Sequence, residues 1–516
     1  MDAFLEEQRL KKLKEDSVDG EGLKKDLENR NSDERYLDLS IYNLSNAIDQ
    51  ISSLCEETPQ DENVLYESFV LFYVELYGFV DYIEKFINKY QYIPSATLRS
   101  TKIHCKLLSL LHYNIPVSVV NLILFIFTQY YLRNEYLIRM IMSTNYSEYV
   151  FQSIFNNTAN YSSYKYIVSS IDGLAANNYD LYKYIVDNDI VSKIFEWKGI
   201  LENTLNNQTQ EPPVPEEYQN AYDTWSQPRI NEKDIIWFNI SFTNIISALF
   251  RITEAIDYAS DLIPKLRDFL TIPDPRIICN IFRAIRYSIK ISPTQRDRFY
   301  SYNYDHEIID FIKNPKEFSN FDVDIEAFMA LCFLCQNDDA ACERYLTVDF
   351  FTSLVRMTNN VPIDLDPFLF NLSMLVIESD SVISNFVFSQ LFEAVCNLFQ
   401  SEAFIVRIDS LMVLTAILKK SQDYDILNTI LHTNILDCFE IMESVDDKSS
   451  IMYFQEAIEN VLNFSLRNGK EDWIEMIKER EFIYSLVQEQ LESEDPDIQS
   501  NAEILINIFE EIGVSD

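Results

Sequence analysis

The amino-acid sequence predicts an all-α solenoid, in which helices stack along one axis around an extended core. Only 7 of the 516 residues are glycine, too few for the many tight turns of a sheet protein or for glycine-rich phosphate loops. Hydrophobic residues make up 47% and aromatic residues 14% of the chain, which is enough for a large core of bulky side chains between helices. An internal helical repeat is the third observation, and it decides the architecture.

Five segments share one pattern: a helix, a break, and a second helix with apolar residues four positions apart. They are DLYKYIVDNDIVSKIFEW, ACERYLTVDFFTSLVRM, SNFVFSQLFEAVCNLF, DILNTILHTNILDCFEIM and EDWIEMIKEREFIYSLVQEQL. Two weaker copies start near Ile263 and Ile308. Anchor positions at 263, 308, 350, 391, 435 and 482 follow one another at steps of 45, 42, 41, 44 and 47 residues. Apolar residues four apart lie on one helix face, so each second helix should bury that face.

A third apolar helix should follow about 20 residues after each anchor, as in AFMALCFLC, FLFNLSMLV, DSLMVLTAIL and ENVLNFSLRN. All-helical units with a period of about 40 to 47 residues are typical of armadillo and HEAT arrays. Three helices per unit favour armadillo over HEAT. We therefore expect one armadillo-like solenoid over residues 60–516, a right-handed superhelix of about ten repeats.

Two segments should interrupt this array. Residues 206–233 contain NNQTQEPPVPEEYQNAYDTW, whose prolines cannot continue a helix, and we interpret them as an exposed insertion. Residues 1–45 combine few aromatics with many charges, which predicts a flexible or only conditionally helical N-terminal segment.

The charge balance restricts the classes of partner. With 82 acidic and 42 basic residues the formal net charge is -40, so the surface should repel nucleic-acid phosphates and anionic lipids and attract a basic protein. Acidity that only keeps a large chain in solution is the alternative. The longest apolar run, Ile115 to Phe127, is shorter than a membrane-spanning helix. We expect protein partners, no nucleic acid and no membrane.

Nothing in the sequence indicates catalysis, a cofactor or a metal. Phosphate-loop, dinucleotide and nucleophile-elbow motifs are all missing, and paired acids carry no information in so acidic a chain. Cys332 and Cys335 form a CxxC pair inside the apolar run FMALCFLC, but no second pair or spaced histidine follows. Buried thiols in a reducing compartment are the simpler interpretation. We expect no enzyme, no cofactor and no metal site.

The repeats and the final unit, FIYSLVQEQLESEDPDIQSNAEILINIFEEI, resemble the armadillo domain of importin alpha. The N-terminal stretch LKKLKEDSVDGEGLKKDLENR is similar to that family's importin-beta-binding segment, in which two basic clusters flank an acidic spacer. The resemblance matches Arg9, Lys11, Lys12 and Lys14 to the first cluster, and Lys24 and Lys25 to the second. Asp26 and Glu28 depart from the family's arginine run. An ordinary solvated tail, or a weakly amphipathic first helix, is the alternative for this segment.

Importin alpha holds localisation signals with tryptophan and asparagine four residues apart on its third helices. Those positions here hold Ser247, Met329, Phe370, Met412 and Asn460 in place of tryptophan, and Arg251, Phe333, Met374, Ala416 and Phe464 in place of asparagine. No WxxxN occurs anywhere in the chain. The resemblance therefore covers the architecture, and the cargo-binding motif is missing.

Two asparagines in third helices, Asn371 and Asn463, are the remaining candidates. They would either face the groove and hold a peptide backbone, or donate hydrogen bonds to a loop of the neighbouring repeat. Two hypotheses follow for the whole chain. The first is a non-catalytic nuclear-import adaptor, cytoplasmic and nuclear, that contacts importin beta and a basic protein cargo. The second is an armadillo scaffold or regulatory protein outside nuclear transport.

Overall fold

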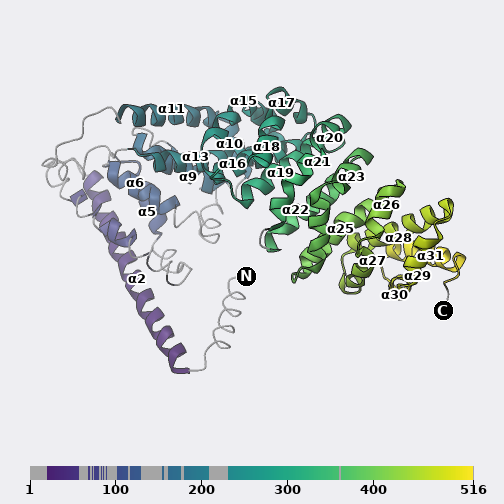
Figure 1. Cartoon of the computed structure of the whole chain (residues 1–516). Coiled ribbons are helices and arrows are strands. Elements are labelled where there is room, and N and C mark those ends of the chain that lie inside the picture. The colour runs from purple at the N-terminus through teal and green to yellow at the C-terminus, as the bar shows by residue number, and fades with distance from the viewer. Residues whose placement is uncertain are drawn as a thin grey trace. The chain divides into compact units, whose positions relative to one another are not determined.

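A computed structural model describes residues 20–56, 102–128 except 114 and 116, 154–155, 161–175, 179–208, 230–359 and 362–514, with scattered positions between 68 and 89. These residues form helices and connecting turns, and no strand occurs among them. The chain divides into two compact units, Met1–Leu249 and Phe250–Asp516, which are described separately (Figure 1).

The second unit is a row of repeats, each made of two short helices and a long third helix. The first helices are η3 (Thr253–Ala255) with α14 (Ile256–Ser260), α17 (Gln295–Ser301), α20 (Asp339–Tyr345), α23 (Asp380–Val387), α26 (Tyr424–Leu431) and α29 (Glu471–Lys478). The second helices are α15 (Ile263–Leu266) with η4 (Arg267–Thr271), α18 (Tyr304–Lys313), α21 (Val348–Ser353) with η5 (Leu354–Asn359), α24 (Gln390–Asn397) with η6 (Leu398–Gln400), α27 (Ile435–Cys438) with η7 (Phe439–Ser444), and α30 (Glu481–Gln490).

The third helices form the spine of this unit. They are α16 (Pro275–Ile291), α19 (Phe321–Cys335), α22 (Pro362–Leu375), α25 (Phe404–Lys420), α28 (Lys448–Asn468) and α31 (Pro496–Glu511). Each packs against the third helix of the next repeat, so they follow one another side by side in Figure 1. The prediction of an all-α repeat solenoid is confirmed. The total of about ten repeats stays a prediction, because the structure describes the chain before residue 161 only in part.

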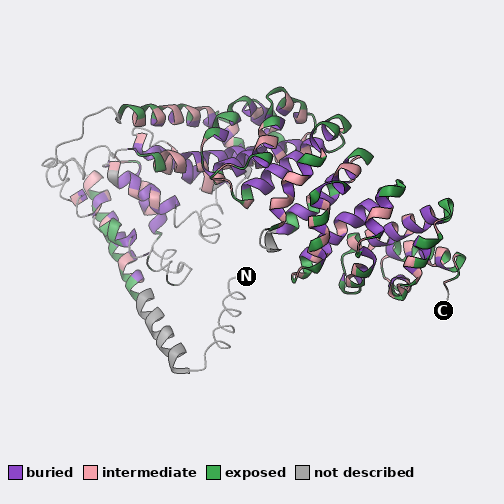
Figure 2. Ribbon diagram, in the orientation of Figure 1, coloured by how far each residue is buried: buried purple, intermediate pink, exposed green. Residues whose placement is uncertain are grey.

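The anchor residues of the predicted repeat all fall in second helices. Ile263, Ile308, Phe350, Leu391 and Ile435 are fully buried, and Figure 2 shows the continuous buried faces to which they belong. The sixth anchor is one residue out of place: Phe482 is half-buried, and its neighbour Ile483 is fully buried instead. Residues 482 and 483 differ by about 100° around the helix, so the buried face of α30 is centred on Ile483 and Leu486, and Phe482 lies at its edge.

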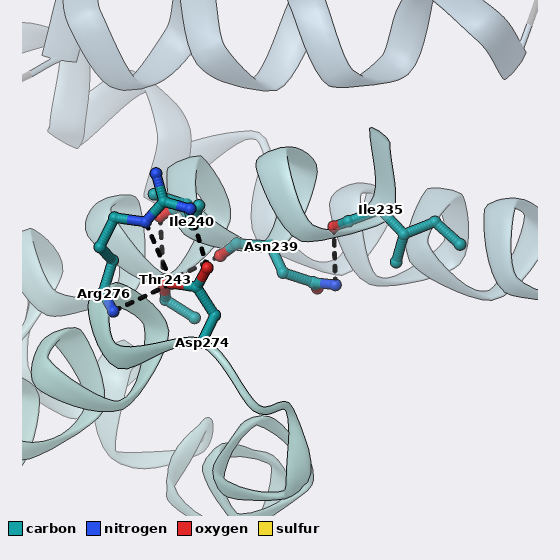
Figure 3. A network of polar contacts seen from close by, with 6 residues as sticks. All are labelled: Ile235, Asn239, Ile240, Thr243, Asp274 and Arg276. Carbon is teal, nitrogen blue, oxygen red and sulfur yellow. Dashed lines mark hydrogen bonds and ion pairs between the residues drawn. The ribbon is translucent and has the colours of Figure 1, made fainter. Parts of the chain in front are cut away.

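Polar side chains cap the N-termini of eight described helices of this unit. Asp274, Asn320, Asp338, Thr347, Ser379, Asp423, Asp447 and Asp495 each accept a hydrogen bond from a backbone N–H of the first turn. In Figure 3 the Asp274 carboxylate also accepts from the Arg276 guanidinium, at 2.8 and 3.1 Å. Such caps satisfy backbone donors that have no partner within the helix.

Asparagine takes the place of glycine at two tight turns. Asn303 and Asn337 have φ of 58° and 56°, in the left-handed region that asparagine tolerates better than most residues. Each turn separates two helices that the repeat pattern predicts. The low glycine count is therefore compatible with many reversals of the chain.

Side chains of one repeat cap carbonyl groups at the helix ends of the repeat before it. Asn460 donates to the Leu418 and Ser421 carbonyls at 2.7 and 2.9 Å, 42 and 39 residues earlier in the chain. Asn385 donates to the Leu346 carbonyl at 2.9 Å, and Arg356 to the Ile312 carbonyl at 3.0 Å. These bonds satisfy acceptors that the helices leave open, and they connect repeats by more than apolar contact.

The first unit contains α2 (Gly20–Glu56), α5 (Ile103–Leu110), α6 (Val117–Ile126), η2 (Tyr161–Ser163), α9 (Tyr164–Ala175), α10 (Tyr179–Asp187), α11 (Ile190–Gln208) and α13 (Glu232–Leu249). Helices α9 and α13 pack together as neighbouring third helices. Small hydroxyl groups join them, since the Ser169 and Ser241 hydroxyls lie 2.7 Å apart. Within α13, Asn239 and Thr243 donate to carbonyls one turn earlier (Figure 3).

Residues 1–45 were predicted to be flexible or only conditionally helical, and their flexibility stays a prediction. From residue 20 on the structure describes a helix, since α2 runs without interruption from Gly20 to Glu56. Its second half carries Leu37, Ile41, Leu44, Ile48 and Ile51, all buried, at helical spacing, and α2 packs against α5. This apolar stripe holds the helix in place and moves the start of the packed chain well before residue 60. Residues 1–19 lie outside the described part.

Around the predicted insertion, α11 ends at Gln208 and α13 begins at Glu232. Both ends lie within a few residues of the predicted limits, 206 and 233. Residues 209–229 are outside the described part of the chain, so the exposure of the insertion stays a prediction.

Candidate partner-binding surface

The third-helix positions that hold the importin-alpha motif form no uniform row in this protein. Met329, Ala416 and Phe464 are buried and contribute to the core. Phe333, Met412 and Asn460 are half-buried. Phe370 and Met374 differ from all of these, because they are large apolar side chains with exposed fractions of 62% and 42%.

Phe370 and Met374 lie four residues apart on α22, so they share one helix face. The opposite face of α22 is anchored by the fully buried Phe368, Leu369 and Leu372, and Phe368 packs against Phe328 of α19 with ring centroids 5.1 Å apart. Helix α22 therefore presents its exposed pair from a fixed support. Together with Asp366, Asp409 and Met412 this pair makes up what we call the α22–α25 surface.

Two carboxylates of the α22–α25 surface lie on neighbouring helices, close enough for the charge of one to act on the other. Asp366 lies one turn before Phe370 on α22, and Asp409 lies on α25. Burial, and then the negative charge of Asp366, raise the pKa of Asp409 to about 7. The Asp409 Oδ2 atom is buried and accepts no hydrogen bond from any residue that the structure describes. Among those residues no lysine or arginine pairs with either carboxylate.

The equivalent place on α16 and α19 has the opposite character, and we call it the α16–α19 surface. Glu326, a buried carboxylate of α19, lies 2.5 Å from Arg283 Nε and 3.3 Å from Arg286 Nη2. The Arg286 guanidinium also lies 3.2 Å from the Met329 sulfur and 4.9 Å from the centre of the Tyr287 ring. These cations of α16 are thus already occupied by groups of the protein.

The first unit contains an aromatic cation site that is filled by its own lysine. The Lys165 ammonium pairs with Asp234 and lies 4.7 Å from the Tyr166 ring centre and 5.6 Å from that of Trp237. Lys165, Tyr166 and Asp234 border a cavity of about 200 Å³. Sequence analysis missed this site, because its members come from separate helices and Trp237 has no asparagine four residues on. Tyr166 and Trp237 are 71 residues apart because the insertion lies between them, so their spacing does not match the period of the other repeats.

The predicted N-terminal site residues lie mainly outside the structure. Arg9, Lys11, Lys12 and Lys14 fall before the first described residue. Lys24 and Lys25 belong to the backbone of α2, and only that backbone is described there. The partner-binding role of these six residues stays a prediction.

The two candidate asparagines each form a hydrogen bond within their own helix, and their groove-facing role stays a prediction. The Asn371 amide donates to the Pro367 carbonyl of its own helix at 2.7 Å, and the Asn463 amide lies 3.4 Å from Glu459 of its own helix. Neither bond reaches a neighbouring repeat. The inter-repeat role belongs to Asn460 and Asn385, which the sequence analysis did not single out for it. Their signal is position, since each reaches the C-terminal end of a helix about 40 residues earlier.

Among the described residues, no group of three or more His, Cys, Asp or Glu could hold a metal ion. Cys332 and Cys335 are buried as predicted, and burial raises the pKa of the Cys332 thiol. Within the same residues no single helix is long and apolar enough to cross a bilayer, although two bent pairs of helices pass by length and composition alone.

Comparisons with known proteins find similar solved structures only. No family model and no curated protein matches the chain. An engineered protein solved by the Northeast Structural Genomics Consortium matches 90% of this chain over 99% of its own length, with a TM-score of 0.58 and 15% identity. A designed armadillo repeat protein, and another in complex with the peptide (KR)4, each match 48% of the chain over 99% of their own length, with TM-scores of 0.40 and identities of 12% and 11%.

The first of these likenesses, at 15% identity, concerns the fold alone. Together with the three-helix repeats, it defines the chain as an all-α, armadillo-like repeat solenoid.

Proposed function

We propose that this protein is a non-catalytic adaptor that binds other proteins along its third helices, and that it works in nuclear import. The exposed pair Phe370 and Met374 carries the proposal. Large apolar side chains exposed together on one rigid face are typical of protein interaction sites. They occupy the third-helix positions at which the importin-alpha family holds its cargo.

The nuclear-import part of the proposal rests on the N-terminal basic segment and on charge. Arg9, Lys11, Lys12 and Lys14 would contact importin beta, as the resemblance implies, and the net charge of -40 would attract a basic cargo. A protein with this role would be found in both cytoplasm and nucleus.

A calorimetric titration of the full chain into importin beta tests this role. We expect micromolar or tighter binding, equivalent to about -8 kcal/mol or better. The matched control changes Arg9, Lys11, Lys12 and Lys14 to alanine and should lose that binding. A wild-type chain with no measurable heat of binding would contradict the nuclear-import role and leave the solenoid fold untouched.

One observation favours a second candidate, an armadillo scaffold or regulatory protein outside nuclear transport. The tryptophan and asparagine ladder is replaced by apolar and buried residues such as Met329, Ala416 and Phe464. Such a chain would bind proteins by other contacts. Partner binding that persists in the four-alanine variant, with no importin beta binding in either protein, is the result expected of this candidate.

A further inference from the structure

We propose that the α22–α25 surface binds an extended segment of a partner protein in which a lysine or arginine is followed two residues later by a large apolar residue. The cation would lie between Asp366 and Asp409, and the apolar side chain would pack on Phe370 and Met374. This inference rests on the proposed protein-binding function and names the chemistry of the bound segment.

The apolar half of the site consists of Phe370 and Met374, which are exposed on a helix whose other face is buried. Phe370 is 62% and Met374 is 42% exposed, while the buried Phe368 and Leu372 fix the helix that carries them. A side chain of the partner that covers both would remove apolar surface from water, at roughly 25 cal/mol per Å². No ordering of α22 would be needed on binding, since its buried face is already packed.

The charged half of the site consists of Asp366 and Asp409, which pair with no cation of the described residues. Burial, and after it the repulsion by the negative charge of Asp366, raises the pKa of Asp409, and Asp409 Oδ2 is buried without a donor among the described residues. A cation supplied from outside would relieve the repulsion and give that oxygen a partner. On the α16–α19 surface Arg283 donates to Glu326 at 2.5 Å and Arg286 forms an ion pair with it at 3.3 Å. Glu326 therefore has cations of the protein beside it, although its Oε2 atom accepts no hydrogen bond among the described residues. A cation of the partner would thus supply at α22–α25 the pairing that arginines of the protein supply two repeats earlier in the row.

The spacing sets the partner's motif. Asp366 and Phe370 are four residues apart on a helix, which corresponds to about 6 Å along its axis. In an extended chain, side chains two residues apart lie about 6.6 Å apart on the same side. A segment that reads Lys-x-Φ or Arg-x-Φ, where Φ is Leu, Ile, Met or Phe, therefore matches both halves at once. A longer run of lysines gains nothing here, because Met374 and Ala416 follow in place of further acids.

A selection from a random peptide library displayed on phage, with the immobilised full chain as bait, tests the motif without assuming it. We expect enrichment of peptides with a cation two residues before a large apolar residue. A selected peptide, labelled with fluorescein, should then bind at least tenfold more weakly to Phe370→Ser and to Asp409→Asn. Changing its cation to serine should cause a similar loss.

Matched controls are available elsewhere on the protein. Phe388 follows α23, is 65% exposed and lies outside the α22–α25 surface, so Phe388→Ser should leave affinity within twofold. Asp472 is an exposed acid at the start of α29, and Asp472→Asn should do the same. Circular dichroism would verify that all four variants keep their helical content.

Three results would overturn the inference. The first is that the enriched peptides lack the cation and apolar pair. The second is that they bind Phe370→Ser as tightly as wild type. The third is that basic runs without an apolar residue dominate the selection. In each of these cases the chain still binds peptides, so the protein-binding function stands and only the assigned surface or motif fails. If wild type enriches no peptide, the inference fails, and the adaptor role depends on the importin beta titration alone.

Discussion

The α16–α19 and α22–α25 surfaces are built from equivalent positions of different repeats, yet one is closed and the other open. On α16 and α19, two arginines neutralise Glu326 and one of them covers Met329. On α22 and α25, Asp366 and Asp409 pair with no cation of the described residues, and Phe370 and Met374 are exposed. The same row of third helices thus carries one surface whose charged groups are paired within the protein and another surface whose polar and apolar groups are available to a partner. Repeat architecture sets the positions, and individual side chains decide whether a position binds.

The largest expected effect separates the two sides of α22. Phe368→Ala removes a fully buried ring that packs on Phe328, and should lower the free energy of unfolding by about 3 to 5 kcal/mol. Phe370→Ala, two residues later on the exposed side, should change it by less than about 0.5 kcal/mol. Urea denaturation of the full chain, followed by circular dichroism, measures both. Equal effects would mean that Phe370 is part of the core and not of a binding surface.

The second-largest effect on stability is expected from a substitution that breaks the ion pairs of the α16–α19 surface. Glu326→Ala leaves Arg283 and Arg286 without their shared carboxylate. We expect a loss of about 2 kcal/mol in stability, below the value for a fully buried ion pair because Arg283 is partly exposed. Asp366→Ala on the α22–α25 surface leaves no cation of the described residues without its partner, so it should cause no loss of stability. Hydrogen exchange of the α16 and α19 amides should speed up in the first variant only.

Asp409 of the α22–α25 surface should make the stability of the protein depend on pH. Asp409 has a pKa of about 7 in the folded protein, raised from 3.8. Between these values the folded state binds more protons than the unfolded state, so the Asp409 contribution lowers stability as pH rises from 4 to 7. Asp409→Asn should therefore be about 1 to 2 kcal/mol more stable than wild type at pH 8, after allowance for partial exposure, and close to it at pH 4.

Asp172 of the first unit provides an internal reference for that measurement. Burial also raises its pKa to about 7, against a hydrogen bond from Asn244 that lowers it. It is unchanged in Asp409→Asn and contributes the same slope to both proteins. A difference curve that is flat with pH would show that Asp409 is not held neutral by its surroundings.

The smallest effects distinguish asparagines that connect repeats from those that do not. Asn460→Ala removes two inter-repeat hydrogen bonds and should cost about 1 to 2 kcal/mol. Asn371→Ala removes one bond to its own helix and should cost less than about 0.5 kcal/mol. Unfolding midpoints in urea would check the pair. If Asn371→Ala costs as much as Asn460→Ala, its bond to Pro367 is structurally important.

The sequence predicts the repeat well because burial in a solenoid is periodic. Ile308, Phe350 and Leu391 are anchored by a face that recurs every 41 or 42 residues, and such spacing is visible without coordinates. The surface was predictable only in part. The positions of Phe370 and Met374 followed from the alignment of third helices, but their exposure depends on neighbours that no local pattern specifies.

Pairing between helices was harder to foresee. Arg283 and Glu326, or Asp366 and Asp409, are 43 residues apart, and many other charged pairs in so acidic a chain have a similar separation. Side-chain geometry selects among them. For residues 1–45 the sequence left a flexible segment and a weakly amphipathic helix open for a different reason: the first half of α2 is charged, and the regular apolar stripe from Leu37 to Ile51 begins only near the end of that segment.

The inter-repeat caps also have a consequence for synthesis on the ribosome. The Leu418 carbonyl near the end of α25 is satisfied by Asn460, which is added 42 residues later, and the Leu346 carbonyl by Asn385, added 39 residues later. At about 5 to 20 residues per second, each newly made repeat remains unfinished for roughly 2 to 8 seconds. Every repeat thus emerges with an incomplete C-terminal side, which the following repeat completes in turn.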